Sequence, residues 1–321
     1  MQRGIRLCLS GLFAGILLVW GCSDRRAGDP VGVNSLIQSQ SLSKSNAQGD
    51  PAILAKMAQI NQQLADRGLS IAAEAIEFYT IGNGRPSARI HQEPFRWVPN
   101  DSRRFADGDK ITYLVDQSDG ATASGLTSAQ TEAAIDAALG TWNSDPSLRK
   151  VQIVKRADTG VDPDIYDSFF GFGEFGTLFL ADIVEAGWLP RAFFEAVGGP
   201  GGGRGILAFT VSFIFVDGNG NPTDINGDNY LDQAFSEIYY NDTFGDPGND
   251  RTGNPWGINQ VLPAIDVQTV AFHENGHALD LGHFGPPPDA VMNPVYAGIR
   301  HSAYPTDDAG MSAVWGSWPN P

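Results

Sequence analysis

Three of the five histidines in this chain fall within residues 271–283, which read A-F-H-E-N-G-H-A-L-D-L-G-H. His273 and His277 are four positions apart, so a helix of 3.6 residues per turn would place both imidazoles on one face, one turn apart. Two imidazoles in that arrangement can reach a single metal ion. Glu274 follows the first histidine and can contact a water on that metal without being a ligand itself. The spacing therefore predicts a metal-binding helix with a carboxylate placed as general base.

The third histidine can join the other two only if the chain turns after the helix. On a continued helix, His283 would lie about 240° around the axis from His277 and would face away from the metal. Asp280 occupies the position at which the related spacing H-E-x-x-H-x-x-G-x-x-H has glycine. Aspartate tolerates the left-handed backbone region at a cost of about 1 kcal/mol, and Gly282 adds freedom just before the histidine. We therefore expect Asp280 to take a positive φ and His283 to complete the site.

Three neutral imidazoles on a tetrahedral zinc ion leave one position open, which distinguishes a catalytic zinc from a structural one. Zinc lowers the pKa of its water to about 7 and polarises a carbonyl group. This predicts hydrolysis with Glu274 as general base. A helix carrying surface histidines is the alternative, but it does not explain the matching offsets of the glutamate and the third histidine. His91 and His301 lie outside the motif, and we do not expect them to be ligands.

The histidine helix is predicted over residues 265–279, within an α+β pattern. A helix capped by Thr127 and a last helix capped by Thr306 are also expected. Strands are predicted at residues 110–116, 151–155, 176–181, 205–217 and 237–241. These elements predict a sheet with helices packed beside it, in a unit that spans residues 108–321.

The N-terminus is predicted to be a targeting segment followed by a tether. Residues 1–21 are typical of a signal peptide, because two arginines precede an uncharged run that is too short to span a bilayer comfortably. The run ends in V-W-G-C, which resembles a bacterial lipobox, so Cys22 is the candidate lipidated residue; an ordinary secretory signal is the alternative. Residues 22–50 are polar and predicted to be flexible. We expect an exported protein, an outer-membrane or cell-surface lipoprotein or otherwise a secreted one.

Residues 51–107 are predicted to form a small N-terminal unit of helical and strand structure. Apolar residues recur at spacings of three and four between Pro51 and Gly68, which predicts a helix with the proline in its first turn. A strand is expected near residues 75–81. The sequence leaves open whether this unit is a propeptide, a packing arm or a separate module.

Charge and cysteine content restrict the partners. The chain has 21 basic and 37 acidic residues, a formal net charge of −16, which argues against nucleic acid and anionic lipid surfaces as ligands. Any membrane contact is therefore expected through the lipid anchor alone. The only cysteines, Cys8 and Cys22, lie in or beside the signal peptide, so no disulfide is expected in the mature protein. We expect a monomer.

Residues 216–232 place acidic and amide side chains at alternate positions, as oxygen-ligand calcium loops require. The candidate ligands are Asp217, Asn219, Asn221, Asp224, Asn226, Asp228 and Asp232. The twelfth position counted from Asp224 is Phe235, so the segment does not match an EF-hand. We expect a calcium site here, with a polar turn as the alternative.

The residues around the histidines resemble metzincins, and within them matrixin-like domains of the matrix metalloproteinase type. The stretch 265–283 is similar to the active-site helix and its exit, and A-V-M-N-P-V-Y at 290–296 is similar to the Met-turn, with Met292 beneath the zinc. Pro294, Val295 and Tyr296 match a segment that in the family forms a wall of the pocket for the side chain after the scissile bond. The resemblance implies a metzincin-like α+β fold with a mixed twisted sheet, an active-site helix, a Met-turn and a C-terminal helix.

The resemblance extends over residues 108–318, and three features depart from it. No mature cysteine is available for the cysteine switch of animal matrixins, Asp280 replaces glycine, and the Gly-rich stretch at 198–205 has no counterpart.

Two functions from different classes follow from these patterns. The leading hypothesis is a zinc endopeptidase that binds an extended protein or peptide substrate along a sheet edge near Ile206 to Thr210. The alternative is a non-catalytic, calcium-stabilised surface lipoprotein that uses a metzincin scaffold for binding. An amidase acting on a non-protein substrate is a third option.

Overall fold

The computed structural model describes residues 48–82, 84–85, 87–105, 108–248 and 253–320. These residues belong to one compact unit, Ser45–Pro321. The predicted signal peptide, Cys22 and nearly all of the predicted tether lie outside the described residues. Within the described part, no helix combines the length and the apolar character needed to cross a membrane.

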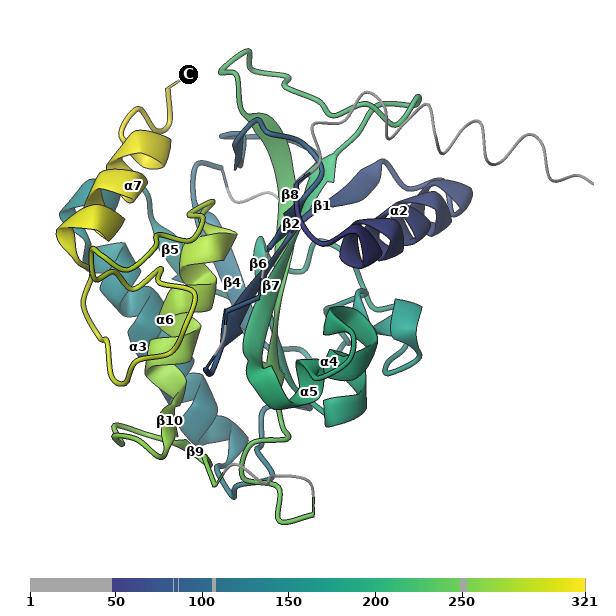
Figure 1. Ribbon diagram of the computed structural model, residues 1–321. Helices are drawn as coiled ribbons and strands as arrows, with labels where there is room; N and C mark the ends of the chain where they lie inside the picture. Colours follow the sequence, from purple (N-terminus) through teal and green to yellow (C-terminus); the bar gives the residue numbers. More distant parts are fainter. Residues whose placement is uncertain (1–47, 83, 86, 106–107, 249–252, 321) are drawn as a thin grey trace, which may run out of the picture. The chain divides into compact units, whose positions relative to one another are not determined.

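A mixed eight-stranded sheet forms the centre of this unit (Figure 1). Its strands are β1 (Ile71–Thr80), β2 (Ala88–Arg89), β3 (Phe95–Arg96), β4 (Ile111–Val115), β5 (Ile153–Lys155), β6 (Ile183–Leu189), β7 (Ile206–Phe215) and β8 (Leu231–Asn241). The order is β2-β1-β7-β8-β6-β4-β5, with β3 paired to β8. Strands β4, β5, β6 and β8 are parallel, whereas β7 is antiparallel to both of its neighbours, β1 and β8. A second small sheet pairs β9 (Trp256–Gly257) with β10 (Ile265–Asp266).

Helices cover both faces of the large sheet (Figure 1). One face carries α3 (Ser128–Ser144) and α6 (Val267–Ala278), and the opposite face carries α2 (Pro51–Asp66), α4 (Arg191–Gly198) and the short α5 (Gly202–Gly205). Helix α7 (Pro305–Trp315) and two 3-10 turns, η1 (Pro146–Leu148) and η2 (Asp167–Phe170), complete the described elements. The predicted α+β class with a mixed sheet is confirmed.

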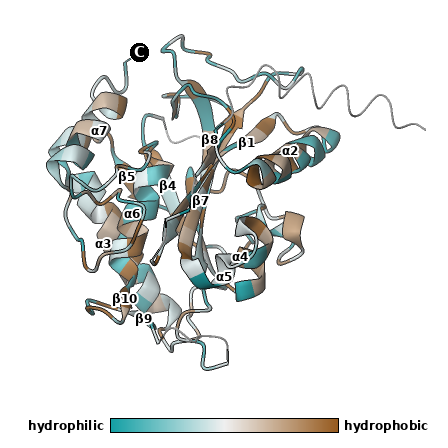
Figure 2. Cartoon of the chain, viewed as in Figure 1, coloured by the Kyte–Doolittle hydropathy of each residue, from teal (hydrophilic) through white to brown (hydrophobic). Residues whose placement is uncertain are grey.

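Each face of the sheet has its own apolar core. The α3 and α6 side buries Trp142, Val270 and Phe272, together with Tyr79 from β1. The opposite side is closed by α2, whose apolar stripe is visible in Figure 2. The residues of that stripe are Ile53, Met57, Ile60 and Leu64. Because β1 contributes to both cores, the two helix layers depend on this strand.

The first turns of helices α2 and α3 have the features predicted from the sequence. Asp50 accepts a hydrogen bond from the Ala52 amide at 2.7 Å, and Pro51 occupies the first turn of α2. Thr127 and Gln130 form a reciprocal capping box at the start of α3.

The predicted cap of the last helix is wrong. Helix α7 begins at Pro305 and is capped by Tyr304, two residues earlier than a Thr306 cap requires. The cause is Asp307, whose carboxylate accepts from the Tyr304 amide at 2.9 Å and so begins the helix before Thr306.

Two strand predictions also fail. Residues 176–181 are not a strand, because Phe179 has a φ of 62° and stacks on Phe215 instead of extending. The strand in this region is β6, at Ile183–Leu189. Residues Ile206 to Thr210 are not at a sheet edge, because β7 is paired on both sides.

Residues 51–107 share the sheet with the later segments. Strand β1 pairs with β7 from Ile71 to Thr80, and β3 pairs with β8. Two buried ion pairs join the same segment to the later sequence, Arg96 to Asp228 and Arg104 to Asp182, each at 2.6 Å.

Candidate metal centre

Helix α6 is held rigidly at the base of the site. Asp266 caps its start by accepting from the Thr269 amide at 2.9 Å, and Trp142 donates to the Phe272 carbonyl at 2.8 Å. Gly276 lies close against Met292, because a Cβ at this position would collide with the methionine sulfur and displace it. The predicted Met-turn therefore packs directly against the helix that carries the histidines.

The three predicted ligands converge. The Nε2 atom of His277 lies 3.0 Å from that of His273 and 3.2 Å from that of His283. Nitrogen atoms bound to one tetrahedral zinc ion are separated by about 3.4 Å, which is close to this arrangement. Among the described residues, no other three histidine, cysteine or acidic side chains bring ligand atoms together in this way.

Hydrogen bonds hold two of the imidazoles in the tautomer that can bind a metal through Nε2. The Nδ1 atom of His273 lies 2.7 Å from the Val291 carbonyl, and that of His277 lies 2.6 Å from the Leu281 carbonyl. Since a carbonyl can only accept, each Nδ1 carries the proton and each Nε2 keeps its lone pair for the ion. Burial lowers the pKa of both histidines well below the usual value and that of His283 to about 4, so all three are neutral near pH 7.

The side chains around His283 come from a part of the chain that sequence reasoning did not connect to the site. Ser87 Oγ lies 3.3 Å from His283 Nδ1, and a Glu77 carboxylate oxygen lies 3.6 Å from the same nitrogen. Ser87 also donates a hydrogen bond to Glu77. Burial raises the pKa of Glu77 to about 7. These two residues are about 200 positions from His283, and no local pattern marks them.

The predicted turn at Asp280 is confirmed by its φ of 60°. The Asp280 amide donates to the His277 carbonyl at 2.9 Å, which closes the turn after α6. Its carboxylate has a second role that was not predicted. It accepts from Arg89 at 2.7 Å and from the Phe95 amide at 3.0 Å, and thereby joins the turn to the N-terminal segment.

Substitutions of Asp280 should separate these two roles. Asp280→Val places a β-branched residue at positive φ and leaves Arg89 without its partner, so we expect an unfolding free energy lower by about 3–5 kcal/mol and zinc affinity lower by about 10–100-fold. Asp280→Gly restores the backbone freedom but not the ion pair, so zinc affinity should stay near wild type while stability falls. Competition with a chromogenic chelator and thermal unfolding measure the two effects.

Asp280→Asn is the matched control for this series, because asparagine tolerates positive φ and can still accept from the Phe95 amide. Equal zinc affinity of the valine and glycine variants would show that the turn does not place His283.

Glu274 is fully buried beside the triad. Its Oε2 accepts from Thr210 Oγ1 at 2.7 Å, whereas Oε1 has no hydrogen-bond partner of ordinary geometry among the described residues. Burial raises its pKa well above the usual value, and hydrogen bonding from Thr210 and an approach of the Tyr79 amide partly offset the rise. A buried carboxylate oxygen left unpaired next to three metal-type ligands is suited to a reacting water.

The Met-turn and the P-V-Y segment are held from two sides. Asp307 of α7 accepts from the amides of Val291 and Met292 at 2.8 and 3.2 Å, an anchoring role that the sequence did not predict. The Tyr296 hydroxyl accepts from the Asp266 amide at 2.9 Å. The same segment pairs with Thr80 of β1, since Tyr296 donates its amide to the Thr80 carbonyl at 2.8 Å.

The predicted calcium ligands have protein partners in this structure. Asp228 pairs with Arg96 at 2.6 Å and Asp232 with Arg103 at 2.7 Å. Asp217 accepts from amides of its own turn, and Asp224 does the same. These contacts describe a polar turn closed by arginines, and calcium binding stays a prediction.

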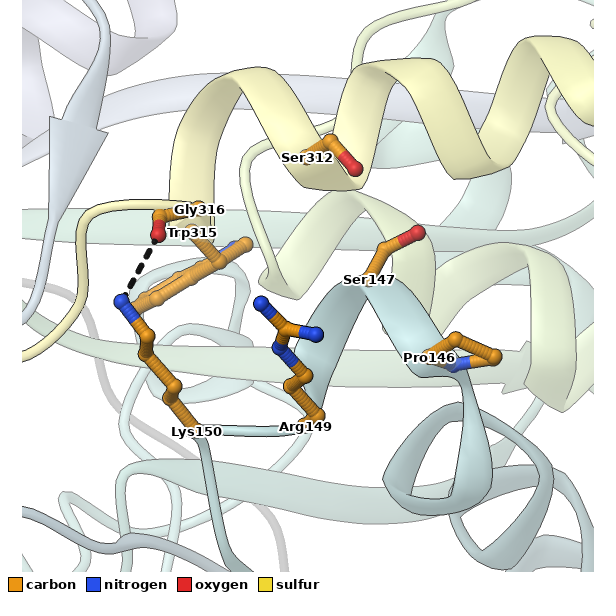
Figure 3. Close-up of a pocket in the computed structure, with 7 residues that line it drawn as sticks. All are labelled: Pro146, Ser147, Arg149, Lys150, Ser312, Trp315 and Gly316. Atoms are coloured by element: carbon orange, nitrogen blue, oxygen red, sulfur yellow. Dashed lines mark hydrogen bonds between the residues drawn. The ribbon is translucent and has the colours of Figure 1, made fainter.

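The remaining histidines and a surface cavity lie apart from the triad. His91 pairs with Glu74 at 2.7 Å and His301 with Asp266 at 2.6 Å, and neither belongs to the cluster of three histidines. A cavity of about 310 Å³ lies between η1 and α7. Lys150, at its rim, donates to the Gly316 carbonyl at 3.3 Å (Figure 3). None of the three metal-type histidines lines the cavity.

Comparison with known families supports the geometry. Residues 214–316 match the family model described as matrixin. The matched segment contains all three converging histidines, Glu274 and the Met-turn. A search of curated proteins found no matching sequence. The mixed sheet, the helix with the histidine triad and the C-terminal helix are those of the matrixin fold.

Proposed function

We propose that the matrixin metallopeptidase domain of this chain, with its zinc-binding histidine triad, is an endopeptidase that cleaves protein or peptide substrates with Glu274 as general base. One observation carries the proposal: three Nε2 atoms converge beside a buried carboxylate, one oxygen of which has no hydrogen-bond partner in the described part of the chain. A structural zinc site would not require that carboxylate.

The residues divide the chemistry between them. Zinc, when bound, lowers the pKa of a water molecule and polarises the carbonyl group to be attacked. Glu274 accepts a proton from the attacking water and delivers it to the nitrogen that leaves. Its raised pKa suits a group that must hold a proton between these two steps. Thr210 fixes Oε2, so that Oε1 remains available for the proton.

The location and the accessory sites form part of the same proposal. Residues 1–21 would direct export, Cys22 would carry a lipid, and residues 22–50 would hold a monomeric enzyme away from the membrane surface, where its substrates are extracytoplasmic proteins. Calcium at 217–232 would stabilise the loop between β7 and β8. Of the three roles considered for residues 51–107, their place in the sheet supports that of a packing arm.

A zinc measurement coupled to cleavage tests the proposal. The soluble chain from residue 50 should bind one zinc ion per molecule and cleave a broad peptide library, and a zinc chelator should abolish cleavage reversibly. Elemental analysis and mass spectrometry of the library give both readouts.

Stoichiometric zinc without hydrolysis of any peptide, before or after prolonged incubation with zinc, would favour the non-catalytic binding protein. Hydrolysis of amides in non-protein compounds alone would favour the amidase.

A further inference from the structure

Strand β1 lies where an extended peptide substrate would lie beside the zinc site. On one side it is antiparallel to β7 from Ile71 to Thr80. On the other side, Thr80 forms a parallel bridge with Val295 in the P-V-Y segment. The strand is therefore held between the inner sheet and the segment that closes the site.

Main-chain hydrogen bonds fix the end of the strand on both sides. Thr80 donates its amide to the Pro294 carbonyl at 3.2 Å and accepts from the Tyr296 amide at 2.8 Å. The next residue, Ile81, donates to the Gly205 carbonyl at 2.9 Å, at the end of the Gly-rich stretch. Proteins that recognise extended peptides by strand addition hold them through main-chain bonds of this kind, with alternate side chains in pockets.

Alternate side chains of β1 face the metal centre. The Tyr79 ring stacks on the His273 imidazole, with centroids 3.7 Å apart and an interplanar angle of 9°. Glu77 lies against His283. Ile76 and Phe78 instead belong to the core on the opposite face of the sheet. Tyr79 is fully buried, and its hydroxyl has no hydrogen-bond partner among the described residues.

Tyr79 is the β1 side chain that lies between the metal ligands and the P-V-Y segment, the expected wall of the pocket for the residue after the cleaved bond. Its ring lies against that of His273 and edge-on to that of Tyr296, with ring centroids 3.7 and 6.0 Å apart. In the proposed mechanism, Glu274 delivers its proton to the nitrogen of the residue that follows the cleaved bond. Tyr79 therefore stands in the place of that residue, with Phe78 before the bond.

We propose that the protein is its own first substrate: β1 closes the metal centre to other peptides, and the site cleaves the chain between Phe78 and Tyr79. This inference rests on the proposed endopeptidase function and adds to it a defined bond and an aromatic preference after the bond. In the reaction, the water oxygen bonds to the Phe78 carbonyl carbon, the bond to the Tyr79 nitrogen breaks, and Glu274 transfers a water proton to that nitrogen. The products end in a Phe78 carboxylate and begin with a Tyr79 amine.

The cut would divide the N-terminal unit at a physically reasonable place. Helix α2 and most of β1 lie before the bond. Phe95, Arg96, Trp97 and Arg104, all buried, lie after it and remain attached to the later sequence. The fragment from Tyr79 thus keeps both buried ion pairs, with Asp228 and with Asp182.

Intact mass and N-terminal sequencing test the cleavage directly. The protein is prepared uncut in the presence of a zinc chelator. After zinc is added, we expect it to convert to two fragments, one that ends at Phe78 and one that begins at Tyr79. Because the bond is already in place, the rate should not change over a wide range of protein concentration. Glu274→Gln should remain whole.

A binding measurement tests the closed site without any turnover. In the zinc-loaded Glu274→Gln protein, a peptide hydroxamate should bind poorly, because β1 occupies its place. Adding Thr80→Pro removes the amide that donates to Pro294 and should tighten binding at least about tenfold, since the ligand no longer competes with a fully bonded strand. Adding Thr80→Val keeps that amide and serves as the matched control, which should stay closed. Calorimetry gives the affinities.

The outcomes separate this inference from the function on which it rests. A whole, zinc-loaded wild type that cleaves added peptides would overturn self-cleavage and leave the endopeptidase standing. Equal hydroxamate affinity with and without Thr80→Pro would overturn the closed site. Cleavage at another bond, or a rate proportional to protein concentration, would overturn the assigned bond. Suppose that the zinc-loaded protein binds the hydroxamate more tightly with Thr80→Pro, yet the zinc-loaded protein with Glu274 intact cleaves neither itself nor any peptide. That result would overturn both proposals.

Discussion

Replacing Glu274 with glutamine should lower the rate of peptide hydrolysis by about 10²–10⁴-fold and leave zinc binding unchanged. The glutamine can still accept from Thr210, so the side chain should keep its place beside the triad. It cannot take a proton from water and return it to the leaving nitrogen. Single-turnover cleavage of a peptide with an aromatic residue after the bond, together with zinc content, measures the two effects.

Glu237→Gln provides the matched control. Glu237 is also fully buried and accepts from the amides of Ile165 and Tyr166, at 2.9 and 3.0 Å, but it lies in the core away from the histidines. It should alter stability and leave the rate per folded molecule unchanged. Wild-type cleavage by a folded, zinc-bound Glu274→Gln protein would disprove the role of Glu274.

The parts of the site that the sequence predicted are those encoded by local geometry. His273, Glu274 and His277 lie on one helix, where spacing fixes their relation, and Asp280 follows three residues after His277, in the turn that ends the helix. Even the unusual conformation of Asp280 was predictable, because only a reversal at that point could bring His283 to the metal.

The parts that the sequence missed depend on contacts between distant segments. Arg89 meets Asp280 across 191 positions, and Ser87 meets His283 across 196. Such pairs are set by strand order, which a single sequence does not specify. The same limit explains why Ile206 to Thr210 was assigned to an open edge. The strand that covers this edge is β1. It belongs to residues 51–107, which lie outside the stretch that resembles metzincins.

The position of β1 also changes the meaning of the N-terminal unit. A dispensable module would leave the sheet and both cores complete without it, whereas β1 contributes to the cores on both faces and to the contacts of the metal centre. The unit is therefore an integral part of the fold, and its later segment carries the two arginines of the buried ion pairs.

A chain that starts at residue 108, the boundary predicted from sequence, should fail to fold. It lacks Arg96 and Arg104, whose partners Asp228 and Asp182 have side chains only 3% and 5% exposed. Leaving one partner of a buried pair uncompensated costs about 3–5 kcal/mol, and two such losses approach or exceed the roughly 5–15 kcal/mol that stabilises a domain. The loss of Trp97, fully buried against Trp315, adds a cavity to this cost.

Circular dichroism and protease resistance at equal concentration measure the outcome, with the chain from residue 50 as the folded reference. Arg104→Met in that longer chain tests one pair alone; it keeps much of the volume, removes the charge opposite Asp182, and should lower the thermal midpoint without abolishing folding. A cooperative, zinc-binding fold from residue 108 onward would show instead that residues 51–107 form a separable module and that the two ion pairs contribute little to stability.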